Sequence, residues 1–188
     1  TNEGFNNGNT LILGHSMGAV ISLALFAERP DWFRGATVIG LPVFEGKDQF
    51  LEQMSSNSFF DKLAVSSYGK VFCMLHPLYI VKWFKPKNLT DDVFRDSKKH
   101  TWQSYYNSLN EVILKTDLYA LTKNIINRKI LFIQGSDDKV APFVNVEKFA
   151  KSFPRAKLME IRDGNHQLFL KEPLEVWKAI DNYFDGKS

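Results

Sequence analysis

Residues 9–23 read NTLILGHSMGAVISL, which is an apolar run, a Gly-x-Ser-x-Gly pattern and a second apolar run. The first run, 10–13, is partly β-branched and is typical of a buried parallel strand. After the glycine pattern, small and apolar residues recur at helical spacing until Pro30, which ends the helix. The stretch therefore predicts a strand, a tight turn centred on Ser16 and a helix.

This turn explains why a serine stands between two glycines. A serine at a strand-to-helix turn takes a strained backbone conformation that exposes its hydroxyl, and we expect Gly14 and Gly18 to be sterically required around it. The same turn directs the Met17 amide and the positive end of the helix at the space above Ser16. The pattern thus predicts a nucleophile at Ser16 and an oxyanion-hole donor at Met17.

The composition is that of a globular chain without a strong charge signature. The 188 residues are 44% apolar and carry a formal net charge of +3 on dispersed basic residues, so we expect no nucleic-acid partner. The single cysteine, Cys73, excludes an internal disulfide, predicts a buried thiol and suits a reducing compartment such as the cytoplasm, although localisation stays open. The most apolar stretch, 71–84, is interrupted by proline and charge, so we expect no membrane span.

Three further apolar runs predict strands at 36–41 (ATVIGL), 130–134 (ILFIQ) and 158–161 (LMEI). Apolar residues at helical spacing follow the last two runs, over 144–153 and 173–184. Strands that alternate with helices form a parallel sheet that is covered on both faces. The sequence therefore predicts the α/β class.

Reactive side chains follow three of the four predicted strands. Ser16 follows the first, Asp138 closes the GSDD stretch after the third, and His166 closes the DGNH stretch after the fourth. In open parallel sheets, chemistry gathers at the carboxyl ends of the strands. A serine hydroxyl needs a histidine to take its proton, and the imidazole needs a carboxylate to fix its tautomer. The order Ser, Asp, His therefore predicts nucleophilic catalysis.

Three motifs of the sequence resemble the α/β-hydrolase superfamily: GHSMGA at 14–19, GSDDKVAP at 135–142 and DGNHQLFLKEP at 163–173. The resemblance runs from Thr10 to the C-terminus. It implies a partial α/β-hydrolase fold with a mainly parallel sheet flanked by helices.

The resemblance also implies roles for individual residues. Ser16 would be the nucleophile, His166 the general base and Asp138 the acid, since the carboxylate stands three residues after the glycine and four before the proline of its motif. Asp137 is the competing acid. Glu45 is a further alternative, because some members of the superfamily place the acid after the preceding strand.

The other histidines point to structural roles. His15 alternates with the nucleophile along an extended chain, so we expect it to pack and to hydrogen-bond under the turn. His76 and His100 have no acid at strand-end spacing and are expected to be solvated or satisfied in the core. No histidine pair has metal-ligand spacing with a carboxylate, so we expect no metal and no organic cofactor.

About eighty residues separate the second and third predicted strands, many more than a helical crossover needs. Residues spaced for helical packing recur over 59–83 and 102–113. The resemblance implies that 43–121 is a helical cap, or lid, on a core of 1–42 and 122–188. Such a lid covers the triad and shapes an apolar pocket for a small ester or acyl substrate.

The superfamily's sheet has four more strands before the serine turn, with a loop that supplies a second oxyanion donor, whereas nine residues precede the first strand here. The chain thus resembles the C-terminal part of a hydrolase, and we expect a missing segment or another chain to cover the edge of its first strand. Because a lost oxyanion donor costs about a hundred- to a thousandfold in turnover, we expect weak activity from these residues alone.

The function expected from these observations is a serine hydrolase of carboxylic esters or related acyl bonds. It would act through an acyl-enzyme intermediate. The alternative is a non-enzymatic or inactive interaction module of the same fold that needs a complementing N-terminal segment.

Overall fold

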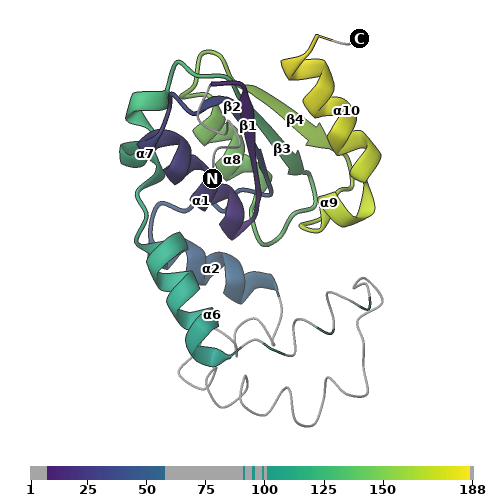
Figure 1. Ribbon diagram of the computed structural model, residues 1–188. Helices are drawn as coiled ribbons and strands as arrows, with labels where there is room; N and C mark the ends of the chain where they lie inside the picture. Colours follow the sequence, from purple (N-terminus) through teal and green to yellow (C-terminus); the bar gives the residue numbers. More distant parts are fainter. Residues whose placement is uncertain (1–7, 58–90, 92–94, 96–98, 100, 187–188) are drawn as a thin grey trace. The chain divides into compact units, whose positions relative to one another are not determined.

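The computed structural model describes residues 8–57, 91, 95, 99 and 101–186 (Figure 1). The chain divides into two compact units. The first consists of Thr1–Glu45 with Lys115–Ser188, and the second of Gly46–Leu114. The sheet and all four of its strands belong to the first unit.

Within the described residues the sheet contains four strands, ordered β1 (Thr10–His15), β2 (Phe33–Ile39), β3 (Ile130–Gly135) and β4 (Lys157–Ile161). All three neighbouring pairs are parallel. Among the described residues, β1 and β4 lie at the two edges. The predicted parallel α/β sheet is therefore confirmed. Because these strands are parallel, their carboxyl ends all lie at the same end of the sheet.

Strand β2 differs from its expected bounds. It begins three residues before the expected range 36–41 and ends two residues before that range ends. The sequence analysis missed residues 33–35 because Gly35 interrupts the apolar pattern. A glycine is needed there because a Cβ at this position would lie 2.4 Å from the Phe184 ring. The strand ends before Gly40 because that residue has a φ of +56°, a left-handed conformation that glycine adopts without strain.

Helices cover both faces of the sheet (Figure 1). On one face, the ring centroid of Phe132 on β3 lies 6.0 Å from that of Phe149, edge to face. On the other face, Leu131 and Ile133 of β3 join a core cluster with Val176. The helices on the Phe132 side are α1 (Met17–Glu28), α7 (Leu118–Leu121) and α8 (Phe143–Ala150). The opposite side is covered by α10 (Pro173–Phe184), while α9 (Leu168–Lys171) and the 3-10 helix η2 (Lys123–Ile125) are short connecting turns.

The second unit contains α2 (Lys47–Asn57), α6 (Trp102–Ser108) and the π-helix η1 (Leu109–Leu114). The helical pattern expected over 102–113 is present as α6 and η1. The stretch 59–83, with Cys73 and His76, lies outside the described residues, as does His100. The role of 43–121 as a lid stays a prediction. In the described part of the chain, no helix is long and apolar enough to cross a membrane.

Candidate active site

Ser16 occupies the junction between β1 and α1, with a φ of 56° and a ψ of −124°. This conformation is costly for a residue with a side chain and is typical of functional turns. The Ser16 amide donates a hydrogen bond of 2.9 Å to the carbonyl of Ile39, which anchors the turn to the neighbouring strand. The next residue, Met17, begins α1, and the first amides of a helix have no intrahelical acceptor.

The two glycines of the pattern differ in their surroundings. A Cβ at Gly14 would lie 2.2 Å from the carbonyl oxygen of Gly18 and 2.4 Å from the hydroxyl of Ser22, so Gly14 is sterically required. A Cβ at Gly18 would meet no heavy atom of the described chain within 4 Å beyond its own helix backbone and chain neighbours. With respect to the described residues, the expectation that Gly18 is sterically required is therefore wrong, because a Cβ there has open space around it.

Asp138 lies in the turn after β3, with its side chain fully buried. Its Oδ1 accepts hydrogen bonds from the backbone amides of Val140 at 2.9 Å and Ala141 at 2.8 Å. Its Oδ2 accepts one from the Nε2 amide of Gln134 at 2.9 Å. The carboxylate is thus held by three donors before the imidazole is counted.

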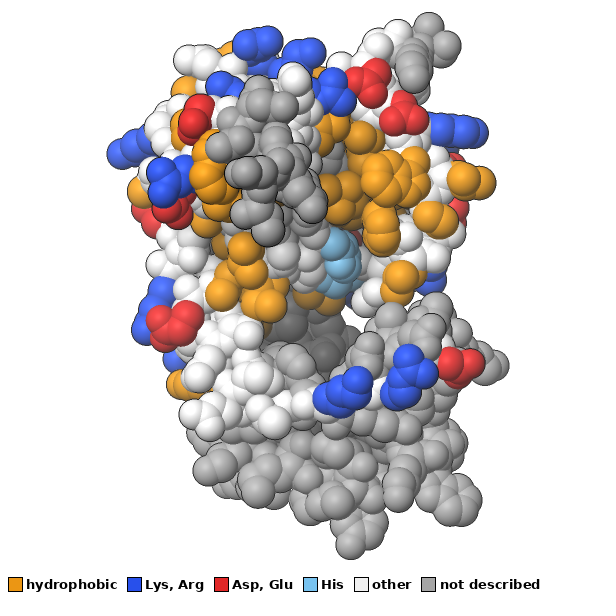
Figure 2. Space-filling model, in the orientation of Figure 1, with side chains coloured by type: hydrophobic (Ala, Val, Ile, Leu, Met, Phe, Trp, Pro, Cys, Tyr) orange, Lys and Arg blue, Asp and Glu red, His pale blue; other side chains and the backbone are white. Residues whose placement is uncertain are grey.

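His166 joins the two other reactive groups. Its Nδ1 lies 2.8 Å from Oδ2 of Asp138, and its Nε2 lies 2.8 Å from Oγ of Ser16. Because an ionised carboxylate only accepts, Nδ1 carries the proton and Nε2 is left to accept from the hydroxyl. The imidazole keeps 14% of its side-chain surface exposed, and histidine surface is visible beside hydrophobic side chains in Figure 2.

The structure separates the three candidate acids. Asp137 has an exposed side chain, and its backbone amide donates to the carbonyl of Gly164 at 2.9 Å. The Glu45 carboxylate forms an exposed ion pair with Lys148. Asp138 is the candidate acid whose carboxylate contacts the His166 ring.

His15 supports the backbone of His166. Its Nε2 donates a hydrogen bond of 2.6 Å to the His166 carbonyl, and the two ring centroids are 5.0 Å apart. Burial lowers the pKa of His15 below its ordinary value of 6.5, against the opposing effect of this hydrogen bond. A neutral His15 that donates from Nε2 fixes the segment that carries the candidate base.

Gln134 was missed by the sequence analysis. It is fully buried, and besides Asp138 its Nε2 donates to the carbonyl of Ala141 at 2.6 Å. The one available signal was a polar residue at the end of the otherwise apolar run ILFIQ. Within the described residues, no group of three or more His, Cys, Asp or Glu side chains is placed to hold a metal ion.

The chemistry that this arrangement permits follows from its order. A hydroxyl on a strained turn meets an imidazole, and a buried carboxylate holds that imidazole in the tautomer that accepts the hydroxyl proton. The positive end of α1 lies beside the hydroxyl. Such a set of groups can activate a serine oxygen for attack on a carbonyl carbon.

Comparison with known proteins agrees with the fold. A family model described as the alpha/beta hydrolase fold matches residues 3–173. A protein of Arabidopsis thaliana named probable lysophospholipase BODYGUARD 5 is 25% identical over 191 residues, which cover 89% of this chain and 43% of that protein. The chain therefore spans less than half the length of this curated relative.

Solved structures of similar fold include a carboxylesterase structure from Nitrososphaera gargenis, with a TM-score of 0.62 and 19% identity over 96% of this chain and 66% of that one. A haloalkane dehalogenase variant from Bradyrhizobium elkanii has a TM-score of 0.65 and 14% identity over 96% of this chain and 68% of the other. These likenesses concern the fold alone. Because one fold hosts several chemistries, the function must be argued from the side chains of the site.

Proposed function

Because this chain belongs to the alpha/beta hydrolase fold family, we propose that it is a serine hydrolase of carboxylic esters or related acyl bonds. Ser16 is the nucleophile, His166 the general base and Asp138 the acid. The observation that carries the proposal is the continuous chain of two 2.8 Å hydrogen bonds from hydroxyl to imidazole to buried carboxylate.

The proposed reaction has two halves. In the first, Oγ of Ser16 attacks the ester carbonyl carbon while Nε2 of His166 takes the hydroxyl proton, and the Met17 amide donates to the oxyanion of the tetrahedral intermediate. His166 then gives its proton to the departing alcohol, which leaves an acyl group on Ser16. In the second half, His166 deprotonates a water molecule that attacks the acyl carbon, and the carboxylic acid departs as Ser16 regains its proton.

The substrate class follows from the same chemistry. We propose an apolar ester or acyl substrate, with residues 43–121 as the lid that shapes its pocket. Because one relative is named a probable lysophospholipase, the esters tested first should include long-chain acyl esters.

The test is hydrolysis of a panel of p-nitrophenyl acyl esters of increasing chain length, measured for the wild type and for Ser16→Ala. We expect turnover that depends on chain length in the wild type and none above background in the variant. Equal rates for the two proteins would remove Ser16 from the reaction.

A second proposal concerns the outer edge of β1. Among the described residues β1 pairs with β2 alone, so no described strand hydrogen-bonds to its outer edge. We propose that a further segment or another chain covers this edge, since unpaired edges invite strand pairing. If that partner also supplies an oxyanion donor, these residues alone would act as a weak or inactive module.

Hydrogen exchange of the β1 amides tests this second proposal. We expect the amides on the outer edge of β1 to exchange quickly in this chain alone, and to slow when the covering segment or chain is present. Slow exchange of all β1 amides in the isolated chain would show that its edge is already protected.

A further inference from the structure

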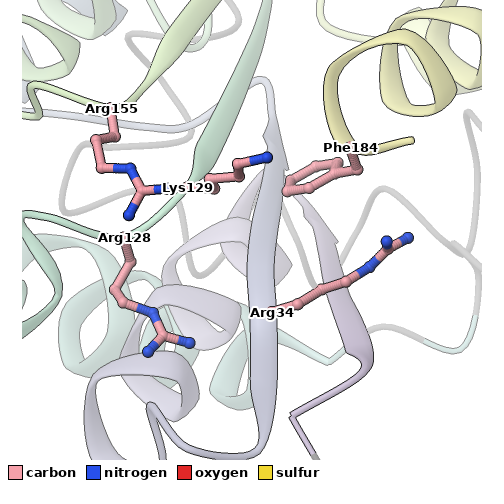
Figure 3. Close-up of a pocket in the computed structure, with 5 residues that line it drawn as sticks. All are labelled: Arg34, Arg128, Lys129, Arg155 and Phe184. Atoms are coloured by element: carbon pink, nitrogen blue, oxygen red, sulfur yellow. The ribbon is translucent and has the colours of Figure 1, made fainter. Parts of the chain in front are cut away.

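A pocket lies at the amino-terminal ends of β2, β3 and β4, whereas the candidate active site lies at the carboxyl ends of the strands. Figure 3 shows the side chains that line this pocket. Its volume is about 330 Å³, and it is lined by Arg34, Arg128, Lys129, Arg155 and Phe184. Arg34 lies near the start of β2, Lys129 directly precedes β3, and Arg155 precedes β4. Because β3 has six residues, at about 3.3 Å each the two ends of this strand lie roughly 20 Å apart.

An aromatic ring packed on glycine helps to form this pocket. The Phe184 ring lies where a side chain at Gly35 would be, 2.4 Å from the position of its Cβ. The Arg34 guanidinium carbon lies 5.9 Å from the centroid of that ring, and the same guanidinium forms an ion pair of 2.7 Å with Asp185. Arg34 is therefore held in place before any ligand arrives.

Two further guanidinium groups donate hydrogen bonds to backbone carbonyls. Arg128 donates to the carbonyl of Phe33, and its guanidinium carbon lies 5.4 Å from the centroid of the Phe26 ring. Arg155 donates from Nη1 to the carbonyl of Asn127 at 3.4 Å. A guanidinium has five N–H donors, so each of these groups keeps further donors for a ligand.

Among the described residues, the positive charges of the pocket are only partly balanced by carboxylates. Four cationic side chains line it, and Asp185 is paired with Arg34, which leaves an excess of three positive charges. In the described part of the chain, no carboxylate forms an ion pair with Arg128, Lys129 or Arg155. Figure 3 shows the Lys129 side chain extending toward the Phe184 ring, from the residue just before β3.

We propose that this pocket binds a phosphate group, carried by a soluble phosphate ester or by a phospholipid headgroup. A phosphate ester carries about −1.5 to −2 charges near pH 7 and presents three strong acceptor oxygens. Planar guanidinium groups pair with such oxygens in two-point contacts. A ligand with a single carboxylate would neutralise one of the three excess positive charges and leave two. The volume lies at the lower end of the range for ligand sites, which fits a headgroup rather than a large molecule.

The test is titration of the protein with inorganic phosphate and phenyl phosphate at constant ionic strength, followed by amide chemical shifts. We expect the amides of Arg34, Lys129 and Arg155 to shift while that of Met17 stays in place. A double variant, Lys129→Met with Arg155→Met, should weaken phosphate binding by about tenfold or more. The matched control, Lys123→Met with Lys171→Met, removes the same charge outside the pocket and should bind like the wild type.

Vesicles of phosphatidylcholine with phosphatidic acid separate the two sources of the phosphate group. Vesicle binding that free phosphate displaces assigns a headgroup, and phosphate binding without vesicle binding assigns a soluble ester. The proposal fails if phosphate shifts no amide of the pocket, or if both double variants lose the same affinity. The single variant Lys129→Gln, which removes a cation that pairs with no carboxylate among the described residues, serves if the double variant does not fold. Because no ester hydrolysis is measured, the result is independent of the proposed catalytic function.

Discussion

Alanine at Gly14 should destabilise the protein and alanine at Gly18 should not, although the two glycines belong to one motif. The Cβ added at Gly14 would lie 2.2 Å from the Gly18 carbonyl oxygen and 2.5 Å from its carbon, which are backbone atoms in the first turn of α1. No rotamer change relieves such a contact, so α1 must move away from β1. The Cβ added at Gly18 meets open space in the described structure.

The magnitudes follow from these contacts. Overpacking a core costs about 1–3 kcal/mol, and the contact with backbone atoms places Gly14→Ala near the upper value, about 3 kcal/mol. Gly18→Ala should be neutral or stabilise by up to about 1 kcal/mol, because alanine favours the helix. A shift of about 1 Å at Ser16 should also slow its reaction by about a hundredfold in Gly14→Ala.

Urea unfolding followed by far-ultraviolet circular dichroism measures the difference. With the slope usual for small proteins in urea, a loss of about 3 kcal/mol lowers the midpoint by about 1–3 M. Gly18→Ala is the matched control, since it makes the same chemical change four residues away. Equal midpoints for the two variants, or a lower midpoint for Gly18→Ala, would refute the steric reasoning.

Four further substitutions, one of them a control, test the hydrogen bonds of the site. Asp138→Asn should slow ester hydrolysis by about 10⁴-fold, because an amide favours the wrong imidazole tautomer. The control variant Asp137→Asn should hydrolyse esters near the wild-type rate. Similar losses of rate in both variants would contradict the assignment of Asp138 as the acid. Gln134→Leu should lower the free energy of unfolding by about 1–3 kcal/mol, because the buried carbonyl of Ala141 loses its donor, and an unchanged urea midpoint would contradict this. Burial lowers the pKa of His15 in the folded protein below its ordinary value of 6.5. As the pH falls through 6.5, His15 is protonated in the unfolded chain but stays neutral in the folded one, so the free energy of unfolding decreases. Urea midpoints measured across this pH range should fall less steeply for His15→Gln than for the wild type.

The sequence was sufficient to predict the parallel sheet and the strand ends that carry the reactive residues. Each strand is built around an apolar run, and each of the three candidate catalytic residues stands in the turn that follows such a strand. Because parallel strands run in the same direction, residues that follow these strands lie at the same end of the sheet. Ser16, Asp138 and His166 could therefore be named before their distances were known.

Other features depend on contacts that local patterns do not contain. The start of β2 was missed because Gly35 looks like a strand breaker, whereas its partner is the ring of Phe184, far along the chain. The motif could not tell Gly14 from Gly18, since the difference lies in which one faces the backbone of α1. Gln134 looked like the polar end of a strand until the following turn brought Asp138 back to its amide.

The central claim is that Ser16 is a nucleophile activated by His166. Incubation of the protein with a fluorophosphonate probe, followed by intact mass measurement and peptide mapping, tests it directly. We predict one adduct per chain, located on Ser16, that forms rapidly in the wild type and is absent from Ser16→Ala. An unmodified wild-type chain, or an adduct on a different residue, would contradict the account.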